Sequence, residues 1–341
     1  MDIDVYYSDP GRGWWPIEDL ALLAARLFRT DIRPVRSERS SRLNLIRHQL
    51  LGAPGRRKRD RAALLIAPSL WNVVEFVREP DLLSQYSQIA TYICDSMHVE
   101  TFTRPGVFRH FDLVARIRPH DENIYRKWVG ERALYAPFGT DALDRGGWRG
   151  ARDLDVLRVG RQPAAWEDDA ASAVKAATAG LTFQGRPPMI EGHEDATQSL
   201  LGFYRRSKFT IAHSNLVAAH GSTHATKEYI TARWTDALAC GTVVAGVQPT
   251  GDRGVAEELW PEGLIHLDDT DIEANLGEIA QANAAWTPEV ARYNHLMSLK
   301  RLDWRWRLRT IATAMDWKVP ALDQDILRLE DRIVAVESGA A

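Results

Sequence analysis

The sequence predicts an α/β protein with two domains, each built on a parallel sheet. Its 341 residues exceed the length that a single hydrophobic core usually serves. Short apolar runs alternate with amphipathic helical stretches along the chain, which is the pattern of parallel strands joined by crossover helices. That alternation stops once, near the middle, and then starts again. We therefore expect two cores.

The first half of the chain contains five apolar runs of strand length. The first run, IDVYY, is followed by the amphipathic stretch IEDLALLAARLF at 17–28, which predicts a helix. Residues 1–148 are thus expected to form a doubly wound, Rossmann-like amino-terminal domain. The strands are expected at 3–7, 63–68, 88–94, 111–117 and 133–138.

Residues 139–153, GTDALDRGGWRGARD, lack periodicity and are rich in Gly, Asp and Arg, so they predict an interdomain linker. The alternating pattern then resumes, and residues 149–317 are expected to form a second Rossmann-like domain. Two such domains have a natural ligand site in the cleft between the carboxyl ends of their strands. The second domain is expected to have strands at 154–160, 181–185, 208–214, 242–246 and 264–268, and helices at 168–179, 196–207, 226–240 and 272–284.

The tail, residues 318–341, predicts one more amphipathic helix. Leu322, Ile326, Leu329 and Ile333 share a face. This face needs a partner surface, and the sequence leaves three open: its own domain, the first domain, or another chain.

Composition excludes several classes of protein. The formal net charge of -3, from 43 basic and 46 acidic residues, provides no general field that would attract nucleic acid or membrane. Only Cys94 and Cys240 are present, both in apolar runs, so we expect no disulfide framework and a reducing, cytoplasmic location. No leader or apolar run of spanning length is found. We expect a soluble protein, in contact with a membrane at most peripherally.

The stretch 227–246, KEYITARWTDALACGTVVAG, is expected to run from a helix into a buried strand and carries two acids, Glu228 and Asp236. Ile230, Trp234, Ala237 and Leu238 form the apolar stripe of that helix, while small residues flank the acids. Eight residues of helix would separate the carboxylates by roughly 12 Å, too far for joint work on one glycosidic bond, which needs ~5–9.5 Å. Two hydroxyl-binding acids beside a phosphate-binding helix start instead fit a nucleotide diphosphate sugar.

A long polar loop, residues 213–228, precedes this helix. Its polar side chains are candidates for donating hydrogen bonds to phosphate, and so is Arg161, just past the first strand of the second domain. The alternatives are a loop that only caps its helix through Thr226, and a surface arginine. The candidates in the loop are Ser214, Asn215, Ser222, Thr223 and Lys227.

These residues resemble a known family. EYITARWTDALACGTVVAG, preceded by LLGFYRRSKFTIAHSN, is similar to the carboxyl-terminal domain of GT-B glycosyltransferases of the group 1 type, including the spore-maturation-like branch. Glu228 and Asp236 match the E-x(7)-E element, with Asp in place of the second Glu, which keeps the charge but shortens the reach by one methylene. The resemblance implies that Glu228 lies by the donor sugar and that Asp236 contacts the ribose.

The resemblance extends to other segments. Arg161 falls where a glycine-arginine pair follows the first strand, but the lysine usually found downstream has no clear counterpart, so phosphate binding by Lys227 does not follow from the family. In the first domain ERALYAPFGTD, FDLVARI and HDENIYRKWVG resemble the family more weakly. The fold implied is GT-B, in which two Rossmann-like domains face each other across a cleft.

The activity implied is that of a hexosyltransferase-like glycosyltransferase in polysaccharide or glycoconjugate biosynthesis. It would move a sugar from a nucleotide diphosphate sugar to an unknown acceptor: a glycan, a lipid-linked or a small molecule. No cofactor or metal is expected, and retention of configuration is implied by the resemblance alone. Two alternatives stay open: a nucleotide-sugar epimerase on the same fold, and a non-catalytic binding protein or partner subunit.

The first domain supplies further candidates. Asp95 and His98 follow a buried strand, where a side chain can orient or deprotonate an acceptor hydroxyl. Equally, Asp95 can cap the next turn and His98 can be structural. Gly11, Arg12 and Gly13 form a loop whose backbone can approach the diphosphate or acceptor, or an ordinary turn; this is not a dinucleotide fingerprint.

Two charged segments remain. The basic run 56–61 is either a solvated loop or a contact for an anionic acceptor or membrane. The acidic segment DDTD, residues 268–271, is expected to cap the helix that starts at Ile272 rather than to bind a metal. No Cys/His spacing predicts zinc.

Overall fold

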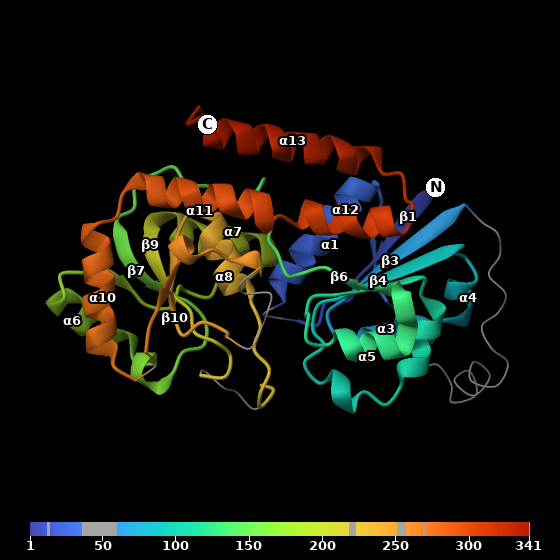
Figure 1. Ribbon diagram of the computed structural model, residues 1–341, viewed down its shortest axis with the longest axis horizontal. Helices are drawn as coiled ribbons and strands as arrows, with labels where there is room; N and C mark the ends of the chain where they lie inside the picture. The colour runs from blue at the N-terminus through green and yellow to red at the C-terminus, as the bar shows by residue number, and fades with distance from the viewer. Residues whose placement is uncertain (12–13, 36–59, 218–222, 251–256, 269, 341) are drawn as a thin grey trace. The chain divides into compact units, whose positions relative to one another are not determined.

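The computed structural model describes residues 1–11, 14–35, 60–217, 223–250, 257–268 and 270–340 (Figure 1). The chain forms two compact units. The first comprises Met1–Pro137 and Arg305–Leu327, and the second comprises Phe138–Trp304 and Arg328–Ala341. In the described part of the chain, no helix is long and apolar enough to cross a bilayer.

The first unit contains a parallel sheet with the strand order β2-β1-β3-β4-β5-β6. The five strands expected here are confirmed, and β2 is an additional short strand at the edge. The strands are β1 (Asp2–Tyr6), β2 (Ile32–Arg33), β3 (Arg61–Ala67), β4 (Gln88–Ile93), β5 (Leu113–Arg116) and β6 (Ala133–Tyr135). The helices are α1 (Trp15–Phe28), α3 (Leu70–Val77), α4 (Pro80–Leu83), α5 (Glu122–Val129) and α12 (Trp304–Ala314), with short 3-10 turns η1 (Val99–Thr101), η2 (Pro105–His110) and η3 (Gly130–Arg132).

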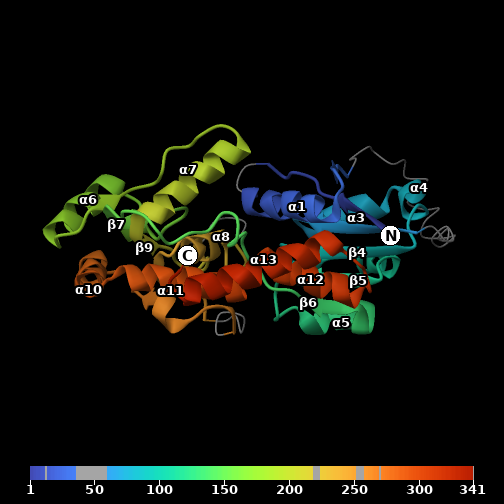
Figure 2. The ribbon, with the colours of Figure 1, turned by 90° about the horizontal axis from the view of Figure 1, so that it is seen from above.

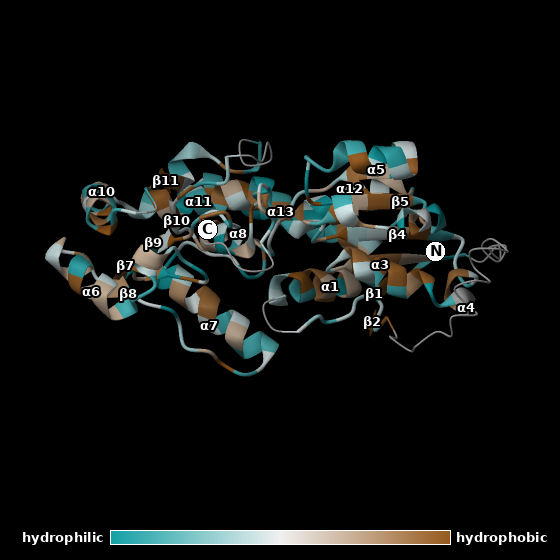
Figure 3. Ribbon diagram, turned by 90° about the horizontal axis from the view of Figure 1, so that it is seen from below, coloured by the Kyte–Doolittle hydropathy of each residue, from teal (hydrophilic) through white to brown (hydrophobic). Residues whose placement is uncertain are grey.

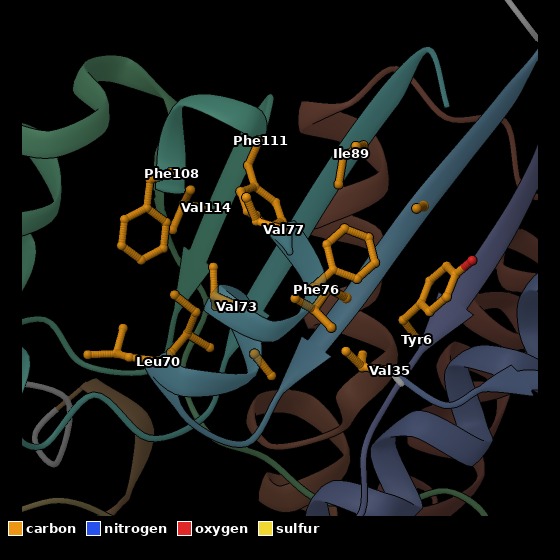
Figure 4. Packing of buried hydrophobic residues seen from close by; sticks show 14 of the residues in the cluster. Tyr6, Val35, Leu70, Val73, Phe76, Val77, Ile89, Phe108, Phe111 and Val114 are labelled. Carbon is orange, nitrogen blue, oxygen red and sulfur yellow. The ribbon is translucent and has the colours of Figure 1, made fainter. Parts of the chain in front are cut away.

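Helices cover both faces of this sheet, with α1 above it and α3 and α5 below it in Figure 1. The face below contains a continuous core in which Val73, Phe76 and Val77 of α3 meet Ile89 and Val114 of the strands (Figure 4). Since β3 ends at Ala67 and α3 begins at Leu70, the first turn of α3 closely follows the carboxyl end of β3. Helix α1 carries bands of both hydrophobic and hydrophilic residues (Figure 3).

The second unit contains a parallel sheet with the order β11-β10-β9-β7-β8. One apolar cluster joins this sheet to α7 and α8, and another joins it to α6 and α10. The strands are β7 (Leu154–Arg158), β8 (Phe183–Gln184), β9 (Ser207–Ile211), β10 (Val243–Gly246) and β11 (Leu264–His266). The helices are α6 (Asp169–Thr178), α7 (His193–Arg206), α8 (Ala232–Ala239), α10 (Ile272–Ala284) and α11 (Pro288–Arg301), with 3-10 turns η4 (Ala164–Trp166) and η5 (Pro261–Gly263).

The segment expected to be a linker, residues 139–153, lies within the second unit. Thr140 exchanges backbone hydrogen bonds with the junction between α11 and α12: its N–H donates to the Leu302 carbonyl at 2.9 Å and its carbonyl accepts from the Trp304 N–H at 2.9 Å. The Gly147 N–H donates to the Ala239 carbonyl of α8 at 2.9 Å. Gly- and Asp-rich composition therefore marks a tightly bonded turn here, and the units divide near Pro137.

The expected tail helix is present as α13 (Pro320–Glu337), and Leu322, Ile326 and Leu329 of its apolar stripe are buried. In the first unit, Asp325 accepts hydrogen bonds from Arg26 at 3.1 Å and Arg305 at 2.9 Å. The carboxyl-terminal part of α13 belongs to the second unit and lies over α11 (Figure 2). The helix thus docks on its own chain.

The helix expected over 226–240 is shorter than predicted. It begins at Ala232, and the residue before it, Thr231, is extended with φ -118° and ψ 171°. Glu228 therefore lies in the loop ahead of α8, and only Asp236 lies on the helix. The prediction that both acids share one helical face was wrong, because hydrogen bonds from neighbouring loops hold residues 227 and 228 outside the helix.

Candidate functional site

The carboxyl edge of the second sheet gathers three loops. The strand β7 comes first in the sequence of this unit. It pairs with β8 on one side and with β9 on the other, and β10 lies beyond β9. The strand order reverses between β7 and β9, which is where open parallel sheets bind ligands. Residues 159–161 leave β7 at this point, residues 212–215 leave β9, and residues 247–250 leave β10.

Glu228 is held at this edge by two of these loops. The Ser214 hydroxyl donates to Oε1 of Glu228. On the other side of the carboxylate, the Thr250 backbone N–H donates to Oε2 at 3.0 Å and the Thr250 hydroxyl lies 3.4 Å from it. Each carboxylate oxygen can accept more than one hydrogen bond. The group is therefore fixed in orientation and still able to accept a hydroxyl from a ligand.

His213, the residue before Ser214, connects the loop after β9 to the loop after β10. Its side chain is fully buried, and its Nδ1 accepts the Val247 N–H at 3.0 Å. Trp166 packs beside the ring. Burial lowers the pKa of His213 to about 4, and the positive charges of Arg233 and His266 add to the effect. At neutral pH the imidazole is thus uncharged, as an acceptor at Nδ1 requires.

This buried imidazole makes stability depend on pH. The pKa of His213 is lower in the folded chain than the ordinary value of 6.5, so the unfolded chain takes up the proton first as pH falls. The free energy of unfolding is expected to drop by up to roughly 3 kcal/mol between pH 6.5 and 4 from this group. His213→Asn, whose Oδ1 can replace Nδ1 as acceptor, should flatten the curve measured by urea unfolding. Parallel curves for the two proteins would contradict this.

Arg161 and Thr223 are brought together at the mouth of the β7 loop. The Arg161 guanidinium is exposed and donates to the Thr223 hydroxyl at 3.4 Å. Beneath it, Arg233 of α8 donates to the carbonyls of Arg161 at 2.9 Å and His213 at 3.3 Å. Gly160 makes room for this arginine: a Cβ there would lie 2.8 Å from Cδ of Arg233.

The two arginines make this edge locally positive. Burial lowers the pKa of Arg233, and the nearby charge of Arg161 lowers it further. Over the ranges that the structure describes, neither guanidinium forms an ion pair with a carboxylate. Uncompensated guanidinium groups are suited to bind an anion such as a phosphate.

The side chain of Asn215 contacts the backbone of Lys227. The Asn215 amide donates to the Lys227 carbonyl at 2.7 Å, and the Lys227 N–H donates to Nδ1 of His224 at 3.1 Å. Asp236 lies one turn into α8, half-buried, and its charge contributes to the raised pKa of Tyr204 on α7. The predicted catalytic residue Glu228 therefore pairs with Ser214, and the predicted donor-binding residues form two further pairs, Asn215 with Lys227 and Arg161 with Thr223. Asp236 lies close enough to α7 for its charge to act on Tyr204.

Three residues of this edge were not singled out from sequence. Thr250 could have been found from the sequence, because it is a polar residue that follows a buried strand, and such residues often lie at the ligand edge of a sheet. Arg233 stands among small residues at the start of α8. His213 was noted only as a position within the strand 208–214 and the loop 213–228. Their roles depend on the register of β9 beside β10, in which Phe209 pairs with Val243.

In the first unit, Asp95 follows β4 and is partly exposed. Its Oδ1 accepts the Met97 N–H at 2.9 Å and Arg118 Nη2 at 3.2 Å. The expected turn cap is thus present, combined with an ion pair to a buried arginine. Ser96 points inward, and its hydroxyl donates to Asp121 at 2.6 Å. One oxygen of Asp95 is committed to structure, which orients the other.

His98 is exposed at the start of η1, where its carbonyl accepts both the N–H and the hydroxyl of Thr101. Gly11 has φ +99°, and its N–H donates to Asp9 at 2.7 Å. Arg12 and Gly13, predicted to act with it, lie outside the described residues.

The remaining predictions concern charged and polar segments. Asp271 accepts the N–H groups of Glu273 and Ala274, so the expected cap of α10 is confirmed. Ser222 and residues 56–59 of the basic run are not among the residues described. Thr226 does not cap α8, because that helix starts at Ala232.

Comparison with known proteins identifies the fold. No protein-family model and no curated protein matches the chain. Among solved structures, HepE from Anabaena in complex with UDP and glucose has a TM-score of 0.57 at 11% identity and covers 93% of this chain and 99% of that chain. An alpha-glucosyltransferase in complex with UDP-glucose and DNA containing an abasic site has a TM-score of 0.57 at 11% identity and covers 90% and 97%.

Sucrose-phosphate synthase from Thermosynechococcus elongatus has a TM-score of 0.51 at 13% identity and covers 92% of this chain and 98% of that chain. Identities this low show the fold alone. Since the likeness extends over most of both chains in each case, the two parallel α/β units form the GT-B fold that the sequence predicts.

Proposed function

We propose that this GT-B protein is a glycosyltransferase that takes its sugar from a nucleoside diphosphate sugar bound by the second unit. The observation that carries the proposal is the fixed carboxylate of Glu228 at the edge where Arg161 and Arg233 stand. A carboxylate accepts hydrogen bonds from sugar hydroxyls, and guanidinium groups hold phosphate. A diphosphate joined to a sugar contains both partners.

UDP is the nucleotide we propose. HepE was solved with UDP and with UDP-glucose, and the alpha-glucosyltransferase was solved with UDP-glucose. A hexose donor is consistent with both neighbours. The sequence resemblance to group 1 enzymes, including the spore-maturation-like branch, supports the same class of donor.

The residues predicted from the sequence have these roles in our proposal. Glu228 accepts a hydroxyl of the donor sugar, and Asp236 accepts a ribose hydroxyl. As the bond from the sugar to the diphosphate breaks, negative charge grows on the leaving UDP, and Arg161, Lys227, Ser214, Asn215 and Thr223 stabilise it. The positive side chains supply this stabilisation without a metal ion.

The acceptor hydroxyl forms the new bond to the sugar and loses its proton. In our proposal the free oxygen of Asp95, or His98, orients that hydroxyl or receives the proton. Retention of configuration is proposed from the resemblance. The buried free thiols of Cys94 and Cys240 support placing the reaction in the cytosol.

The proposal is tested by incubating the protein with UDP, GDP, dTDP and CMP sugars and following the products by chromatography. We expect slow hydrolysis of a UDP-hexose to UDP and free sugar, and faster release of UDP once an acceptor is added. Isomerisation of the sugar without release of UDP would show an epimerase. Binding without any turnover would show a non-catalytic binding protein, and either result would refute the proposal.

A further inference from the structure

Trp71 has the most exposed side chain of the tryptophans that the structure describes, with 56% of its surface accessible. It lies in the first turn of α3, whose other large residues are mostly buried. In the first sheet β1 pairs with β2 on one side and β3 on the other, so the strand order reverses between β1 and β3. Trp71 thus follows β3 at the ligand edge of this sheet.

Aromatic side chains pack against the indole of Trp71. The ring of Phe102 meets it edge-on at 6.1 Å and 73°, and Phe102 rests in turn on Phe108 at 5.9 Å and Trp128 at 5.8 Å. At the start of α3, the N–H and hydroxyl of Ser69 both donate to the side chain of Asn72. These bonds fix the start of α3, from which the indole of Trp71 projects.

Arg104 adds a positive charge to this surface. Its guanidinium carbon lies 5.7 Å from the centroid of the Trp71 ring, within the range of a cation–π contact. The side chain is exposed. Within the described ranges its guanidinium makes no ion pair and no hydrogen bond. The guanidinium therefore lies over the Trp71 ring, with its N–H donors not paired to any carboxylate of the described residues.

The same edge carries the candidate acceptor residues. The Cys94 N–H donates to the Ala67 carbonyl at 2.9 Å, which joins the start of the loop after β4 to the end of β3. That loop carries Asp95 and His98 and continues through η1 into Phe102, which supports Trp71. Trp71 and Arg104 are therefore tied to Asp95 by short, hydrogen-bonded segments.

We propose that Trp71 and Arg104 form a subsite for a pyranose ring that carries a carboxylate, so that the acceptor is an acidic saccharide. The C–H face of a sugar ring is weakly positive and packs on the negative face of an indole. Arg104 then pairs with the carboxylate through two parallel N–H bonds, the geometry that a guanidinium favours. An isolated exposed tryptophan would need no explanation. Here an aromatic ring packed on Phe102 lies next to an arginine without a carboxylate partner among the described residues, and this combination suits a ligand that has both an apolar face and a negative charge. That this saccharide is the acceptor rests on the proposed function, whereas its binding to Trp71 and Arg104 does not.

Two matched probes test the subsite: methyl β-D-glucuronide and methyl β-D-glucoside, which differ only in the carboxylate. Binding is measured by ligand-observed NMR titration of the full chain, with no nucleotide present. We expect the glucuronide to bind about fivefold more tightly than the glucoside at low salt. Arg104→Ala should reduce the glucuronide to the level of the glucoside, and Trp71→Ala should weaken both about tenfold.

Controls come from the same chain. Arg149→Ala removes an exposed arginine that stacks on Trp148 at 5.1 Å, and Tyr293→Ala removes an exposed aromatic ring of α11. Neither change should alter binding. Thermal unfolding of Trp71→Ala, and of the milder Trp71→His, distinguishes lost binding from lost folding.

Three results would overturn the inference: equal binding of the two probes, unchanged binding by the folded Trp71 variants, or tighter binding of an oligothymidylate, which would show a base-stacking surface instead. Failure of the proposed function is recognised separately. In that case UDP does not bind, while the glucuronide still binds and still depends on Trp71 and Arg104.

Discussion

Glu228→Gln is expected to lower kcat/KM for transfer from a UDP-hexose by about 10-fold or more. The reason is the loss of negative charge at a carboxylate that two loops of the second unit hold in place. A neutral amide still accepts through its oxygen, but it accepts more weakly, and a hydrogen bond to a charged group is about twice as strong as a neutral one.

The glutamine variant is expected to fold normally. Its amide oxygen can accept the Thr250 N–H, and its amide N–H group can donate to the Ser214 hydroxyl oxygen, so both anchoring contacts persist with a reversed donor. Glu228→Ala removes both contacts and should abolish transfer. Comparing the two variants separates the loss of charge from the loss of the loop anchor.

The control is Glu278→Ala, which removes an exposed acid from α10 in the same unit. Its kcat/KM should stay within twofold of the unchanged protein, since no contact of the site involves it. Activity of Glu228→Gln close to that of the control, with UDP-hexose at saturation and below it, would defeat the role given to Glu228.

Gly246→Ala is expected to destabilise the second unit by about 3 kcal/mol or more. A Cβ at Gly246 would lie 1.9 Å from the carbonyl oxygen and 2.6 Å from the carbonyl carbon of Ala212. Both atoms are backbone, in the segment where β9 passes into the loop of His213 and Ser214. Neither can move without breaking the bond from the Ala212 N–H to the Ala245 carbonyl, 2.9 Å.

Gly277→Ala is the matched control for that change. Gly277 lies inside α10, and a Cβ there would meet nothing within 4 Å. The same substitution should therefore stabilise the protein by up to about 1 kcal/mol, because alanine favours a helix over glycine. Urea unfolding measures both variants. Equal effects on the free energy of unfolding would show that the close approach at Gly246 has no energetic weight.

The strands were predictable from sequence, whereas the start of α8 was not. Runs such as QIATYIC and TVVAG are apolar, short and bounded by polar or turn residues, so burial alone fixes them. At the start of α8, Ile230 and Trp234 have helical spacing, which favoured a helix from residue 226. Tertiary contacts decide otherwise: the Asn215 amide holds the Lys227 carbonyl, and Ser214 holds Glu228.

The candidate site was predictable in part for a related reason. Glu228, Ser214 and Asn215 follow or precede buried elements, so their place at the edge of the sheet follows from the pattern. Thr250 and Arg233 join them only through the pairing of β9 with β10 and the packing of α8, which no local spacing encodes. Composition also misled at residues 139–153. There the Gly147 N–H bonds to α8, and the backbone bonds to the junction between α11 and α12.

The central claim is that the second unit binds the nucleoside diphosphate of a sugar donor at the edge that contains Arg161. Calorimetric titration with UDP tests it most directly. We expect binding with a Kd between ~1 μM and 1 mM, weakened about tenfold or more by Arg161→Ala and unchanged by Arg149→Ala. Absence of binding by UDP, GDP and dTDP alike, or equal affinity in the Arg161 variant, would contradict the claim.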